Sequence, residues 1–97
     1  MELQKHLQYI TNLSVRENSN PKIRGVTANW KEDGKTACIS FYFDGEVSNK
    51  DIELASDTCA EIIAHFSDGF LEEHYIRWDY PKALPNAKFL AYKRESE

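Results

Sequence analysis

A strand, a turn and a helix are predicted for residues 36–66, and this stretch constrains the fold most. Residues 36–44 alternate in the period-two pattern of a half-buried strand. One face carries Ala37, Ile39, Phe41 and Phe43, and the other carries Thr36, Cys38, Ser40 and Tyr42. We expect the first face to lie in the core.

The predicted helix follows at once. Asp44-Gly45-Glu46 has the composition of a turn, and Ser48 precedes the Asp51 carboxylate by three residues, as in a capping box. Apolar residues then recur at helical spacing: Ile52, Ala55, Cys59, Ile62, Ile63 and Phe66. Ser48 is therefore the predicted N-cap of a helix that packs on the aromatic face of the strand.

The preceding residues predict a helix and a first strand. Residues 2–13 have an amphipathic pattern, and residues 14–22 are expected to form a polar loop. Val26, Ala28 and Trp30 then alternate with Gly25, Thr27 and Asn29. Asp33-Gly34 is a strong hairpin signal, so the first two strands should pair antiparallel.

After the central helix, Gly69 in Ser67-Asp68-Gly69 is expected near the C-cap. Residues 70–80 predict a third strand, in which Ile76, Trp78 and Tyr80 alternate with Tyr75, Arg77 and Asp79. Two prolines make residues 81–86 a non-helical connection to a last strand over 89–93. The predicted fold class is α+β: a single αββαββ domain over residues 1–97, with a four-stranded, mainly antiparallel sheet, helices on one face and an open strand order.

Composition limits the functional classes. A length of 97 residues with 41% hydrophobic content suits one domain. Neither end has a signal-like or membrane-spanning pattern, so a cytoplasmic location is expected. The net charge of −4 argues against binding to nucleic acid or to anionic membranes.

The charge is unevenly distributed along the chain. Residues 44–79 contain ten acids and two bases, a balance of −8, whereas the remaining residues contain six acids and ten bases, a balance of +4. We therefore expect an acidic surface, although a solvated face without a function is the simpler alternative.

No cofactor, metal site or enzymatic activity is expected. Cys38 and Cys59 should lie on opposite sides of the strand and form no disulfide. No CxxC motif or Cys/His cluster exists in the sequence, and His6, His65 and His74 stand far apart. Asp57, Glu61 and His65 recur at four-residue steps on the helix, and His74 follows two glutamates, but no nucleophile accompanies either group.

Aromatic residues near acids are typical of protein interfaces. In this chain Tyr75 is one of the aromatic residues of this kind. The predicted partner-binding residues are Tyr42, Asp44, Glu46, Asp51, Glu53, Asp57, Trp78, Asp79 and Tyr80. Core packing is the alternative for Trp78 and Tyr80.

The strings Phe41-Tyr42-Phe43-Asp44-Gly45-Glu46 and Ile76-Arg77-Trp78-Asp79-Tyr80-Pro81, followed by Leu84-Pro85, support a resemblance. From about residue 23 to 93 the chain resembles small acidic bacterial immunity proteins of polymorphic-toxin and contact-dependent growth inhibition loci. The resemblance implies a cytoplasmic antidote that binds a cognate toxin domain, often a nuclease, and covers an essential surface. An acidic face would suit a basic toxin domain.

The alternative is a self-associating or regulatory interaction module without catalytic activity. Its open sheet face, with Cys38, Ser40, Tyr42 and Tyr75, would pair with a copy of the chain or with a host protein. A toxin gene directly upstream of the gene for this chain would favour the antidote, and its absence would favour the module.

Overall fold

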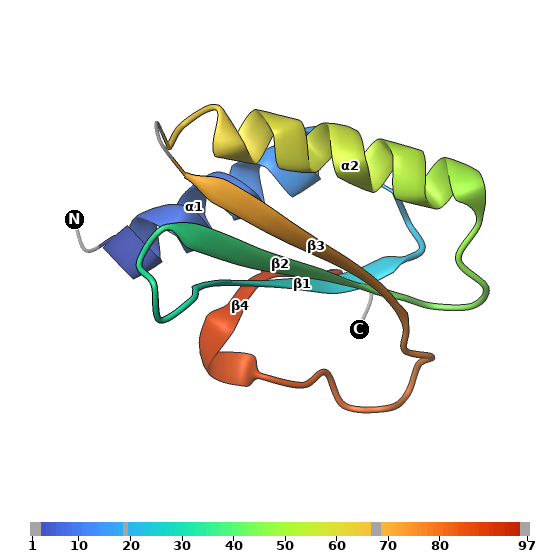
Figure 1. Cartoon of the computed structure of the whole chain (residues 1–97). Helices are drawn as coiled ribbons and strands as arrows, with labels where there is room; N and C mark the ends of the chain where they lie inside the picture. The colour runs from blue at the N-terminus through green and yellow to red at the C-terminus, as the bar shows by residue number, and fades with distance from the viewer. Residues whose placement is uncertain (1–2, 19, 67–68, 96–97) are drawn as a thin grey trace.

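The computed structural model describes residues 3–18, 20–66 and 69–95. The elements are α1 (Leu3–Glu17), β1 (Ile23–Trp30), β2 (Thr36–Phe43), α2 (Asn49–Ile63), β3 (Phe70–Arg77), the 3-10 helix η1 (Ala87–Phe89) and β4 (Leu90–Lys93) (Figure 1). The predicted α+β class is confirmed, and the two helices and four strands follow one another as αββαββ, with η1 inserted before β4. Within the described ranges, neither helix is long and apolar enough to cross a membrane.

The sheet is mixed, so the prediction of a mainly antiparallel sheet is wrong. Its strand order is β3-β2-β1-β4, and β1 pairs antiparallel with both β2 and β4. β3 instead runs parallel to β2, with Thr36 opposite Phe70 and Phe43 opposite Arg77. The physical reason is α2, which returns the chain to the beginning of β2 before β3 starts, as in a βαβ crossover.

One core forms between the helices and the sheet. The predicted core face of β2 is confirmed, because Ala37, Ile39, Phe41 and Phe43 are all fully buried. The same cluster contains buried side chains from the other elements: Leu7, Val15, Ile23, Val26, Ala28, Ala55, Cys59, Ile62 and Ala91. α1 contacts β1 and β4, whereas α2 contacts β3 and α1.

The helix ends differ partly from the expectation. Ser48 is the N-cap of α2 with a complete capping box, as predicted. α2 ends at Ile63 with Ala64 as its C-cap, before Gly69; Ser67 and Asp68 lie outside the described residues. α1 continues to Glu17 and so includes residues 14–17, which were predicted to be part of a loop. The reason is that Val15 lies on the same helical stripe as Leu7 and Thr11 and is buried with them.

The connection from β3 to β4 must cross the sheet, because these strands form its two opposite edges. We call residues 78–86 the crossing loop. It lies on the side of the sheet away from α2 (Figure 1). A Cβ atom at Gly25 would lie 2.8 Å from Leu84 Cδ1, so this loop packs directly on β1. The predicted third strand was therefore too long, since β3 ends at Arg77 and residues 78–80 begin the crossing loop.

Candidate functional site

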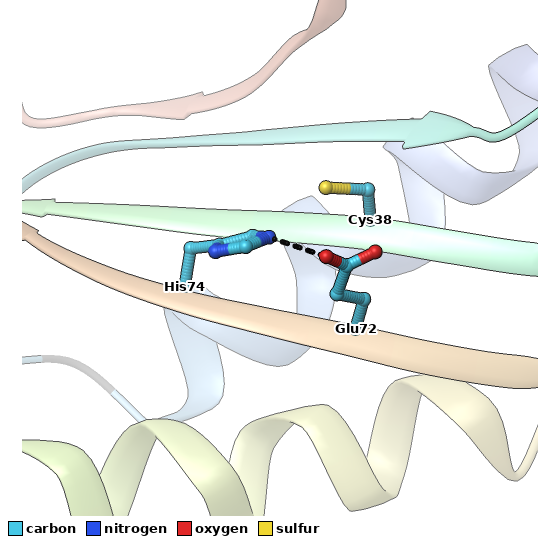
Figure 2. A group of neighbouring side chains, drawn as sticks. All are labelled: Cys38, Glu72 and His74. Carbon is cyan, nitrogen blue, oxygen red and sulfur yellow. Dashed lines mark hydrogen bonds and ion pairs between the residues drawn. The ribbon is translucent and has the colours of Figure 1, made fainter.

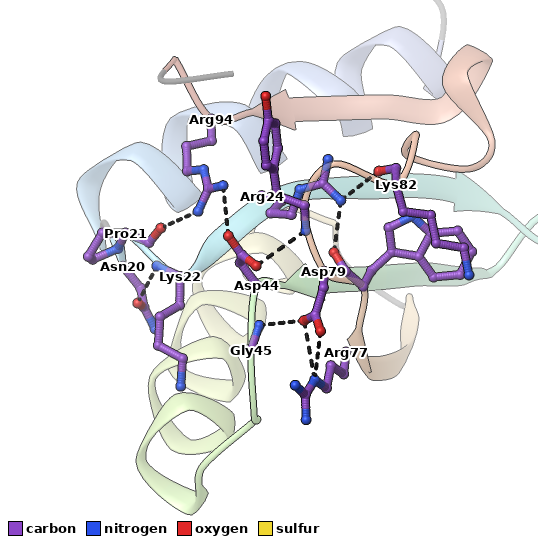
Figure 3. A network of polar contacts seen from close by, with 12 residues as sticks. Asn20, Pro21, Lys22, Arg24, Asp44, Gly45, Arg77, Asp79, Lys82 and Arg94 are labelled. Carbon is purple, nitrogen blue, oxygen red and sulfur yellow. Dashed lines mark hydrogen bonds and ion pairs between the residues drawn. The ribbon is translucent and has the colours of Figure 1, made fainter.

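Two of the segments predicted to bind a partner meet at one end of the sheet. Because β2 and β3 are parallel neighbours, residues 44–46 and 78–80, which follow them, lie at the same end of the sheet. The Gly45 N–H donates to Asp79 at 2.7 Å (Figure 3), and the Tyr80 N–H donates to Asp44 at 3.2 Å. Gly45 has a φ of +91°, a backbone conformation that residues with a side chain rarely adopt. We call these two segments the strand-end corner.

Several of the predicted acids are already paired inside the molecule. Asp44 pairs with Arg94 at 3.1 Å, and Asp79 pairs with Arg77 at 3.2 Å. The Arg77 guanidinium, with the Gly45 N–H, lowers the pKa of the Asp79 carboxyl. Arg94 lies far outside residues 44–79 in sequence, so folding brings basic residues onto the acidic stretch. The uneven charge along the chain is therefore partly compensated in space.

Asp51 is also an internal residue. It is only 7% exposed and accepts hydrogen bonds from the Lys22 ammonium at 2.5 Å, the Asn20 amide at 2.9 Å and the Ser48 N–H at 2.9 Å. Its carboxylate closes the capping box of α2 and ties the helix to the residues before β1. The structure therefore assigns Asp51 a structural role, and the expected contact with a partner does not fit its burial.

The predicted aromatic contact residues also differ in exposure. Tyr42 is 3% exposed, its ring contacts the edge of Trp78 with centroids 5.9 Å apart, and its hydroxyl lies 3.4 Å from Thr27 Oγ1. A partner cannot reach Tyr42 in this arrangement, so its predicted contact role is not supported. Trp78 is half-buried and donates from Nε1 to the Ala83 carbonyl at 2.8 Å, while the Lys82 ammonium lies 3.9 Å from its ring.

Arg24 organises the crossing loop, and the sequence patterns did not identify it. Its side chain is buried and donates to the backbone carbonyls of Trp78 at 2.8 Å and Lys82 at 2.7 Å. Its guanidinium also lies 5.5 Å from the Tyr80 ring centroid. A charged residue in an otherwise buried strand was the available signal, because a buried arginine must find acceptors.

Five of the predicted residues are exposed, and one of them, Asp79, is paired with Arg77 as described above. Tyr80 is 58% exposed on the strand-end corner, and Glu46, Glu53 and Asp57 are exposed in the turn before α2 and along α2. We call these three acids the exposed acidic set. Among the described residues, no ion pair is found for any of them. They can meet a basic partner without breaking an internal pair.

A second constellation lies on the sheet face opposite the core. The parallel register places Cys38 beside Glu72 and Ser40 beside His74. The Cys38, Glu72 and His74 ligand atoms lie within 4.8 Å of one another (Figure 2). No metal site was expected from the sequence, because no Cys/His cluster lies along the chain. The parallel pairing of β2 and β3 nevertheless brings Cys38 and His74 together, since separation in sequence does not limit contact between paired strands. Asp57 and Glu61, by contrast, are exposed on α2, and His65 is exposed just after its C-cap.

Comparison with known proteins gives one match to a family. The model of the family described as MafI2 immunity protein matches residues 5–96, nearly the full length of the chain. No curated protein matches the sequence.

Proposed function

Because the chain belongs to the MafI2 immunity protein family, we propose that it binds a cognate toxin domain and neutralises it. The immunity-protein class predicted from the sequence is confirmed by this membership. The match over residues 5–96 is the observation that carries the proposal, since it covers α1 from residue 5 onward, α2 and the four described strands.

The proposed toxin-binding surface consists of the exposed acidic set and Tyr80. Glu46, Glu53 and Asp57 are accessible carboxylates, which suits a basic toxin domain such as a nuclease. Tyr80 extends from a corner that is held by hydrogen bonds of Asp44 and Asp79, so little side-chain and loop entropy needs to be lost on binding. In this proposal Asp44, Asp79 and Trp78 support the surface, and Tyr80 is its aromatic anchor.

Neutralisation by this route requires no catalysis by the chain. Covering the active site or another essential surface of the toxin is sufficient, and the cytoplasm is the proposed place where the two proteins meet. We propose a locus of the polymorphic-toxin or contact-dependent growth inhibition type, with the toxin gene next to the gene for this chain.

The experiment combines growth and binding. The toxin domain encoded next to this gene is expressed with and without the chain. We expect the toxin-expressing cells to grow only when the chain is co-expressed. Tyr80→Ala should weaken binding by about 2 kcal/mol or more, mainly through faster dissociation. Tyr9→Ala is the matched control, because Tyr9 is a similarly exposed tyrosine on α1. Failure of the parent chain to bind or protect against that toxin would refute the proposal.

The self-associating module loses part of its expected interface. Tyr75 stacks on Phe41 with centroids 5.9 Å apart and packs against the core, and Tyr42 is buried under Trp78. Tyr75 therefore lies on the other face from Cys38 and Ser40, since it pairs with Phe41. Homodimer formation is tested separately by light scattering of the purified chain.

A further inference from the structure

The sheet face opposite the core carries a thiol, a carboxylate and an imidazole side by side. We propose that Cys38, Glu72 and His74 form a binding site for a zinc-like divalent cation. Their ligand atoms lie within 4.8 Å of one another, and all three residues are partly accessible (Figure 2). Sulfur, imidazole nitrogen and carboxylate oxygen are the ligands that Zn²⁺ takes in proteins. This site is separate from the proposed toxin-binding surface.

The backbone already positions the three side chains. Cys38 and Glu72 are directly paired across β2 and β3, and His74 lies two residues beyond Glu72 on the same face. Metal–ligand bonds of about 2.0 to 2.3 Å require ligand atoms roughly 3.5 Å apart in a tetrahedral site. Side-chain rotations that move the ligand atoms by about 1 Å therefore complete the site while both strands stay in place. A water molecule supplies the fourth ligand.

Groups that already contact the Glu72 carboxylate would compete with a bound cation. Lys31 forms an ion pair with Glu72, and His74 Nε2 lies 3.1 Å from Glu72 Oε1. The Lys31 contact lowers the pKa of Glu72, so the carboxyl is ionised and ready to bind. Burial and the nearby Glu72 charge raise the pKa of the Cys38 thiol, so cation binding must release its proton. Lys31 is therefore a competitor for the same carboxylate that the cation would use.

Cobalt titration of the tag-free, chelator-treated full chain tests the site. Co²⁺ should bind with one-to-one stoichiometry and give a thiolate-to-cobalt charge-transfer band in the near ultraviolet, and Zn²⁺ should remove that band by displacement. Cys38→Ser should abolish the band. Glu72→Gln and His74→Asn should each weaken Co²⁺ binding about tenfold or more, comparable to or above the effect of losing a supporting contact.

The controls separate the site from general metal binding. Cys59→Ala removes the buried thiol on α2, and His65→Asn removes an exposed histidine; neither should change the band. Lys31→Met should strengthen Co²⁺ binding, because the competitor for Glu72 is removed; a purely structural role of Glu72 predicts no such gain. Circular dichroism establishes that each variant is folded.

Two results would overturn the proposal: the absence of stoichiometric Co²⁺ binding to the folded parent chain, or a charge-transfer band that survives in Cys38→Ser. The measurement uses no toxin. Its failure is therefore distinguishable from failure of the proposed antidote function.

Discussion

Asp51 shows at the scale of one residue how a buried charge supports the fold. Burial raises the pKa of its carboxyl, but the Lys22 ammonium and the hydrogen bonds from Ser48 and Asn20 outweigh this and hold it well below the usual range. The charged form thus stabilises the folded state at neutral pH. This stabilisation is lost as the pH falls from the carboxyl pKa of the unfolded chain toward the lower pKa of the folded chain.

Asp51→Asn should therefore lower the unfolding free energy at neutral pH by about 1 to 3 kcal/mol, because it weakens a helix cap and a charged hydrogen bond. It should also flatten the decrease in stability between about pH 5 and pH 3. Urea unfolding over this pH range measures both effects, with the exposed Asp57→Asn as control. Parallel pH curves for Asp51→Asn and the parent would contradict the assignment.

Phe41 is the residue on which the core depends. It is fully buried and stacks with Phe43 and Tyr75 at centroid distances of 6.5 and 5.9 Å. Phe41→Ala should cost about 3 to 5 kcal/mol, because it removes transfer free energy and leaves a cavity. Phe70→Ala is the matched control, since Phe70 is 66% exposed and should change stability by less than about 1 kcal/mol. Chemical denaturation of both variants decides the comparison.

At the scale of an element, the crossing loop depends on Arg24. This side chain holds the Trp78 and Lys82 carbonyls, so Arg24→Met should leave two loop carbonyls without their donor. Trypsin should then cleave after Lys82 faster than in the parent, while the far-ultraviolet circular dichroism of the sheet and helices persists. Arg16→Met, on the exposed side of α1, should not change the cleavage rate. An unchanged rate for Arg24→Met would show that Leu84 and Trp78 packing alone hold the loop.

At the scale of the whole molecule, the exposed charges should govern how fast a toxin associates. Reversing Glu53 and Asp57 to lysine should slow association with a basic toxin domain by about tenfold or more, and added salt should reduce the difference. Glu32→Lys is the matched control, because Glu32 is an exposed acid in the β1–β2 hairpin turn and does not belong to the exposed acidic set. An association rate that is indifferent to salt and to both reversals would identify the exposed acidic set as a merely solvated face.

The sequence by itself determined the features that depend on neighbours along the chain. The alternation of β2 identified Phe41 and Phe43 as core residues, Asp33-Gly34 identified the hairpin, and Ser48 identified the start of α2. Each follows from a period or a cap that acts over a few residues. The immunity-protein class also followed from the sequence, through resemblance.

Only the tertiary structure decided which distant residues meet. The parallel pairing of β3 with β2 depends on the path of α2, and that pairing joins Gly45 to Asp79 and Cys38 to Glu72. The partners of Asp51 and Asp44 lie 29 and 50 residues away, so the net charge of a stretch did not predict its surface. Strand order and ion pairs depend on the route of the whole chain, and no local period contains that information.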